Sequence, residues 1–169
     1  GLFNLRSGAS ATIDRSAITG NIADNHGGGV FSYLDARIEL TNSTVSANRS
    51  FTDGALWNSD GRLTVLNSTV VGNSSEVGAV FASFGDDVIV NTLIAKNGTN
   101  CDGSYETSSH NLTDDDSCGP GFRQVTNVGL GPLADNGGVT VTHAVQDGSP
   151  AIDAGDQQTC TALDGIWDQ

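Results

Sequence analysis

The chain repeats one pattern of apolar and polar positions at intervals of about 25 residues. Aligned on an asparagine, successive copies lie 27, 25 and 24 residues apart, and aliphatic residues stand three and eight positions before each asparagine. The asparagines are Asn21, Asn48, Asn73 and Asn97, and the aliphatic columns are Ile18, Val45, Val70 and Ile94, and Ile13, Leu40, Val65 and Ile89. A third column, six positions before each of these asparagines, holds Arg15, Asn42, Asn67 and Asn91. This periodicity predicts one structural unit per copy.

A second block keeps the same step and pairs an aliphatic with an aromatic position. It occupies residues 1–4, 29–32, 55–58 and 79–82. Its aliphatic column is Leu2, Val30, Leu56 and Val80, and its aromatic column is Phe3, Phe31, Trp57 and Phe81. Two blocks in step argue against chance similarity, so each copy is interpreted as one turn of a repeat.

Each copy contains two short β-rich stretches separated by Gly or Asn turns. One unit cannot bury its apolar face alone, whereas stacked units pair equivalent strands in parallel at about 4.8 Å and align like side chains in ladders. Coils this short leave no room for a crossover helix. The sequence therefore predicts an all-β parallel β-helix, a solenoid of about four coils with aliphatic ladders inside and asparagine ladders at the turns. An antiparallel sandwich is the alternative, but it does not explain why one residue type recurs at one phase.

The repeat fades after Asn97 and gives way to a loop-rich segment. We therefore predict β-helix coils at 1–97 and a C-terminal cap at 98–169, because the terminal units of a solenoid must close its core against water. Residues 1–4 match the end of a coil, so we expect the natural protein to continue upstream.

Three cysteines add a constraint on the cap. Cys101 and Cys118 flank a loop rich in Gly, Ser and Asp, and their spacing fits no metal-binding CxxC pattern. A bridge between them would close a loop of roughly 18 residues, which is worth about 3 kcal/mol. A disulfide implies an oxidising compartment, so we expect an extracellular or cell-surface location. Cys160 is left over, to pair outside this chain or to remain free.

Several segments resemble a known group of proteins. The repeat LTVLNSTVVGN (63–73) and the tail GPLADNGG (131–138) with THAVQDGSPAIDAGD (142–156) are similar to bacterial right-handed parallel β-helix proteins with a choice-of-anchor type C-terminal domain, which carry repeats like those of polymorphic outer-membrane proteins. The resemblance implies a right-handed coil, a bacterial origin and secretion or attachment to the cell surface. It also places His143 in the tail motif, where we expect it to bond within the cap. The segment ALDGIWDQ (162–169) departs from the pattern of the group.

Composition and charge narrow the function classes. The net charge is −13, and nucleic-acid binding needs a basic surface that this chain lacks. An anionic membrane or polysaccharide would also be repelled at long range. No apolar run approaches the ~18 residues of a membrane span, so we expect a protein that does not cross the membrane.

Catalysis is disfavoured by the placement of ionisable residues. Lyase chemistry needs a base and cations that neutralise a uronate, but the basic residues form no group at one phase of the repeat. They are Arg6, Arg15, Arg37, Arg49, Arg62, Arg123 and Lys96. Glycosidases need two carboxylates about 5–9 Å apart, and no acidic pair recurs on adjacent coils. The sequence favours a non-catalytic structural or adhesive module, with a domain that binds or cleaves extracellular polysaccharide as the alternative.

Calcium is the one cofactor that the acidic loops suggest. Hard oxygen ligands could come from Asp102, from the run 114–116, or from Asp135 and Asn136. None of these has the DxDxDG spacing of a calcium loop, so we predict no metal site.

The aromatic column is the candidate binding surface. Successive residues of a strand point to opposite faces, so either the aliphatic or the aromatic column faces outward. Outward rings at Phe3, Phe31, Trp57 and Phe81 would form a platform on which extracellular glycans could stack. The alternative is an aromatic stack with a purely structural role.

Overall fold

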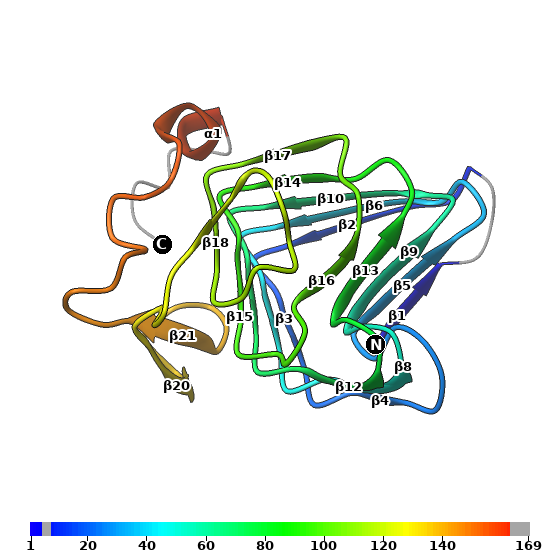
Figure 1. Cartoon of the computed structure of the whole chain (residues 1–169), viewed down its shortest axis with the longest axis horizontal. Helices are drawn as coiled ribbons and strands as arrows, with labels where there is room; N and C mark the ends of the chain where they lie inside the picture. The colour runs from blue at the N-terminus through cyan, green and yellow to red at the C-terminus, as the bar shows by residue number, and fades with distance from the viewer. Residues whose placement is uncertain (5–7, 163–169) are drawn as a thin grey trace.

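The computed structural model describes residues 1–4 and 8–162, and within them it leaves out the side chains of residues 2–4 and 160–162. The fold is a parallel β-solenoid of about three turns, and the described residues also include a short helix, α1 (Gln157–Ala162). Figure 1 looks along the stack, with sheet A on the right, sheet B at the top, sheet C on the left and sheet D at the bottom. The predicted all-β parallel solenoid is confirmed.

Each side of the coil is a parallel sheet built from equivalent strands. Sheet A contains β1 (Leu2–Asn4), β5 (Val30–Tyr33), β9 (Leu56–Ser59), β13 (Phe81–Phe84) and β16 (Cys101–Gly103). Sheet B contains β2 (Ser10–Asp14), β6 (Arg37–Thr41), β10 (Arg62–Leu66), β14 (Val88–Val90) and β17 (Thr107–Ser109). Sheet C contains β3 (Ala17–Thr19), β7 (Thr44–Ser46), β11 (Thr69–Val71), β15 (Leu93–Ala95), β18 (Asn111–Thr113) and β19 (Phe122–Gln124). Sheet D contains β4 (Ile22–Ala23), β8 (Arg49–Thr52) and β12 (Ser74–Val77).

The number of complete coils is smaller than the predicted four. Three coils contribute a strand to all four sheets, whereas β13–β15 and β16–β18 form shorter coils without a strand in sheet D. The step from Leu93 on β15 to Leu112, its register partner on β18, is only 19 residues, which is too short for a fourth side. Stacking therefore continues beyond Asn97, and the predicted boundary there comes too early, because the shortened coil loses the repeat spacing but still pairs its strands in register.

The interior is filled by ladders of aliphatic side chains. Alternate residues of each strand point inward, and those of sheets A, B and C meet along the axis of the coil. Fully buried members of this core include Val30, Leu56, Leu40, Val65, Ile89, Val45, Val70 and Ile94. These are the aliphatic columns expected from the repeat.

The predicted asparagine ladder runs along one corner. The Nδ2 group of each asparagine donates to Oδ1 of the next, at 2.8 Å for Asn21 to Asn48, 3.0 Å for Asn48 to Asn73 and 3.2 Å for Asn73 to Asn97. Each Oδ1 also accepts from the backbone N–H of the preceding asparagine in the ladder. The ladder thus satisfies buried polar groups that a tight turn would otherwise leave unpaired.

The second asparagine column has a different cause. Asn42, Asn67 and Asn91 have φ of 49°, 48° and 52°, and Asn is the non-glycine residue that best tolerates this left-handed conformation. Their amides also bond along the axis, from Asn67 to Asn42 at 3.4 Å and from Asn91 to Asn67 at 3.0 Å. Arg15 and His110 adopt the same conformation in the first and last coils, with φ of 45° and 54°.

The C-terminal part covers the end of the core and then packs against the outer face of sheet C. Cys101 and Cys118 form the predicted disulfide, with their Cα atoms 4.8 Å apart, and both join the core cluster. The Tyr105 ring contacts Phe81 edge-on at 5.6 Å and lies 5.9 Å from Phe122, so this segment covers the end of the core.

The remainder of the tail runs back along the outer face of sheet C (Figure 1). It contains an antiparallel hairpin of β20 (Leu130–Ala134) and β21 (Thr142–Val145). Val71, Leu93, Ala95 and Leu112 project outward from sheet C and are buried with Val128 and Leu130 of the tail. We call residues 125–156 the lateral strap, because they clamp successive coils from the side and do not cover the end of the core.

Candidate functional site

Two rings of the predicted aromatic column lie on the outer face of sheet A. Phe31 and Trp57 pair in register, and both are half-buried, whereas the neighbouring Val30 and Leu56 are fully buried inside. The Phe31 and Trp57 rings stack with centroids 4.6 Å apart at an angle of 17°. His26 stacks on Trp57 at 4.8 Å. The aliphatic column therefore faces inward, and this part of the aromatic column faces outward.

Phe81 does not belong to this column. It pairs with Leu56, not with Trp57, and its side chain is fully buried in the core. Phe81 follows Asn73 by eight residues, just as Leu56 follows Asn48 by eight. The alignment by aromatic type was thus wrong by one residue, because register is set by the distance from the asparagine ladder. The backbone of Phe3 pairs with Phe31, but its side chain lies outside the described residues.

The stacked arrangement limits what the aromatic pair can do. Sugar rings bind aromatic side chains through their flat faces, and here Phe31 and Trp57 cover each other's faces. This geometry favours the structural alternative, in which the rings pack on each other along the outside of sheet A.

A second surface, not predicted from the sequence, lies on the outer face of sheet B. Arg37 and Arg62 pair in register on neighbouring strands, so two basic residues do share one phase of the repeat. The prediction that the basic residues form no group at one phase is therefore wrong for Arg37 and Arg62. The signal was present, since Arg37 and Arg62 each stand eleven residues before a ladder asparagine, Asn48 and Asn73.

The two arginines line a shallow groove of about 290 Å³. Its walls are outward-facing residues of three coils, namely Ser10, Thr12, Arg37, Glu39, Arg62 and Thr64, over Ala11 and Ile38. Arg62 Nη1 lies 3.1 Å from Oε2 of Glu106. Arg37 is exposed, and among the described residues it makes no ion pair.

A polar cluster is buried inside the coil between sheets A and B. Ser32, Asn58 and Ser83 point inward in register, and Asp87 joins them with no exposed surface. Asp87 Oδ1 accepts hydrogen bonds from the Leu63 backbone N–H at 2.8 Å and from Asn58 Nδ2 at 2.5 Å. Loss of hydration raises the pKa of Asp87 to about 6, although the polar groups around it act in the opposite direction.

The acidic run 114–116 organises the cap loop. Asp114 accepts from the Lys96 N–H and from Asn100 Nδ2, and Asp115 accepts from Asn100 and Ser117. Partial burial would raise the pKa of Asp115, but these hydrogen bonds outweigh it and hold that pKa below its usual value. Most carboxylate oxygens that could bind calcium here are thus already hydrogen-bonded, and among the described residues no three metal-binding side chains cluster.

The histidines have separate environments. His143 bonds within the tail, as expected, through Nδ1 and the Gly131 carbonyl oxygen at 2.9 Å. Its Nε2 also lies 2.9 Å from Oγ of Ser46, 97 residues earlier in the chain. This contact joins the lateral strap to the second coil.

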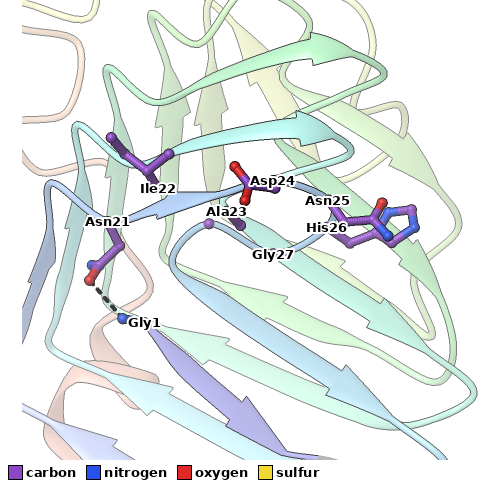
Figure 2. A pocket seen from close by; sticks show the side chains of 9 residues that line it. Gly1, Asn21, Ile22, Ala23, Asp24, Asn25, His26 and Gly27 are labelled. Carbon is purple, nitrogen blue, oxygen red and sulfur yellow. Dashed lines mark hydrogen bonds between the residues drawn. The ribbon is translucent and has the colours of Figure 1, made fainter.

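Another depression, of about 430 Å³, lies at the first coil (Figure 2). It is lined by Gly1 and by the turn from Asn21 to Gly28, and the Gly1 amino group donates to Asn21 Oδ1. In Figure 2 the side chains of Asp24 and His26 spread along the turn and do not converge on one point. No chemistry is therefore assigned to this depression.

No protein-family model, curated protein or solved structure matches the chain. The resemblance to choice-of-anchor proteins consequently rests on the sequence segments alone, and the solenoid rests on the structure. Within the described part of the chain, no helix is both long and apolar enough to cross a membrane.

Proposed function

We propose that this chain is a non-catalytic structural module of a secreted or cell-surface bacterial protein, in which a rigid stack of coils presents its outer faces to adhesive partners. A solenoid is compatible with structural and adhesive roles. The disulfide supports an oxidising location, and the tail segments quoted above support the bacterial assignment.

The observation that carries the proposal is the lateral strap. In most solenoids each coil contacts only its neighbours, so terminal coils can open separately. Here the chain passes the end of the stack and returns to the second coil, where His143 meets Ser46. It also bonds to the coil formed by β13–β15, where the Asp156 N–H donates to Asn91 Oδ1 at 2.7 Å. Because these contacts link the tail to coils that are not adjacent, we expect the coils to unfold together, as a rigid spacer requires.

Native-state hydrogen exchange tests this coupling. We expect the protected amides of β7, β11, β15 and β18 to exchange through one common opening, with a single free energy. Separate, graded opening energies from coil to coil would contradict a rigid module. In parallel, the chain should release neither reducing ends nor unsaturated uronates from a panel of polysaccharides, and turnover would overturn the non-catalytic assignment.

A glycan-binding role at the aromatic pair is the second candidate. It is favoured by one observation, that Phe31 and Trp57 face outward on sheet A. Trp57→Ala should then abolish retention on a neutral glycan array while the fold survives. The buried Phe81, substituted by Leu, serves as the matched control. Unchanged retention in Trp57→Ala would leave the aromatic pair with its structural role only.

A further inference from the structure

The outer face of sheet B combines a groove with an unusual pairing of like charges. Residues Arg37 and Arg62 oppose each other on parallel strands, which lie about 4.8 Å apart in such a sheet. Like charges directly opposite are destabilising. The chain has 20 acidic residues and only seven basic ones, so chance offers few opportunities for an arginine to face an arginine. Such a local conflict marks a position shaped by something other than folding.

The two guanidinium groups are only partly compensated. Glu106 pairs with Arg62 at 3.1 Å, but the exposed Arg37 has no ion pair among the described side chains. Glu39 is exposed on the same face, in the neighbouring column between Thr12 and Thr64. The groove thus places positive charge in one column beside a column of hydroxyl and carboxylate oxygens.

We propose that this groove binds an acidic polysaccharide through the carboxylate of a uronate residue. The planar fork of a guanidinium group matches a carboxylate in bidentate geometry, and a carboxylate lying between Arg37 and Arg62 relieves their mutual repulsion. Thr12 and Thr64 exchange hydrogen bonds with the sugar hydroxyls, and Glu39 accepts one from them. The proposal concerns a different face from the aromatic pair and does not depend on the scaffold role.

The net charge of −13 does not prevent this contact. Repulsion from distant acidic residues is screened beyond about 8 Å at physiological salt, whereas the two arginines act at contact distance. Binding is therefore governed by local hydrogen bonds. Substitution of Arg37 should consequently weaken binding more than substitution of an arginine elsewhere on the surface, although both remove one charge.

The test is isothermal titration with oligogalacturonate at 0.15 M salt, about physiological ionic strength, with neutral dextran and dextran sulfate as comparison ligands. We expect oligogalacturonate to bind and Arg37→Gln to weaken it at least about tenfold, the loss of one charge-assisted bidentate contact. Arg37→Lys keeps the positive charge but not the planar guanidinium group, so its affinity should lie between those of the native protein and Arg37→Gln. Arg123→Gln is the matched control, because Arg123 is exposed on β19, away from the groove.

Four outcomes overturn the proposal. They are the absence of oligogalacturonate binding, an equal loss in Arg123→Gln, equal affinity for neutral dextran, and binding of dextran sulfate alone, which would assign the groove to sulfate esters. Circular dichroism and thermal melting of each variant establish that it is folded. Arg37→Lys keeps the proposal testable if Arg37→Gln does not fold.

Discussion

Replacing the buried Asp87 by Asn should stabilise this protein at neutral pH. The Asp87 carboxyl group has no exposed surface, and Oδ2 has no hydrogen-bond partner among the described residues. Asn at this position keeps an oxygen that can accept from the Leu63 N–H and from Asn58 Nδ2. It removes the charge that burial disfavours.

The size of the effect follows from the difference in pKa between the two states. The pKa of Asp87 is raised from 3.8 to about 6 in the folded protein, because burial penalises the ionised form. Below pH about 4 both states are protonated, and the stabilising contribution is fully present. Between pH about 4 and 6 the unfolded chain ionises while the folded protein keeps its proton, so stability falls as pH rises. A shift of this size corresponds to about 3 kcal/mol, lost by pH 7 in the native protein but not in Asp87→Asn.

Urea denaturation of both proteins at unit steps from pH 4 to pH 8 measures the difference. Other carboxyl groups act in the opposite direction, since Asp115 has a lowered pKa and its contribution is lost as the pH falls. Subtracting the unfolding free energy of the native protein from that of the variant at each pH removes the contributions of these other groups. Asp24→Asn is the control, because Asp24 is exposed on the first coil, away from Asp87. A stability difference that stays constant from pH 4 to pH 7, or a variant less stable at pH 7, would refute the reasoning.

Three further substitutions probe separate features. Replacing Cys101 and Cys118 together by Ser should lower the unfolding free energy by about 3 kcal/mol, measured by urea denaturation, and reductant should have the same effect on the native protein. Asn73→Ala breaks the buried ladder and leaves backbone groups unpaired, so a loss of about 3 kcal/mol is expected, whereas the exposed Asn136→Ala should change little. His143→Ala should speed proteolysis of the hairpin with little effect on the core sheets, and unchanged cleavage would mean that its bond to the second coil is dispensable.

The sequence allowed the stack to be predicted because equivalent residues in adjacent coils have equivalent surroundings. The asparagine ladder is the clearest case, since Asn48 and Asn73 make the same bonds in successive coils. Phe81 lies outside the aromatic column, although it matches by residue type, because the count from that ladder sets the register. The same count from the ladder places Arg37 beside Arg62.

The lateral strap could not have been predicted in this way. Its contacts join residues such as Ser46 and His143, which are 97 positions apart and belong to no repeat. The burial of outward residues such as Val71 and Leu112 depends on that same return of the chain. No periodic signal marks which outer face the tail will cover.

The lateral strap also restricts the number of coils between its two attachment points. One point is its hydrogen bond to Ser46 in the second coil, and the other is where the chain leaves the disulfide-closed segment at the end of the stack. A coil inserted between these points by duplication would shift the contact by about 4.8 Å, one strand spacing. The strap would then meet the next coil, where the residue in register with Ser46 is Val71, which offers no hydroxyl. Coils can therefore be gained or lost only upstream of the second one, and the distal part of this protein is held to a constant number of turns.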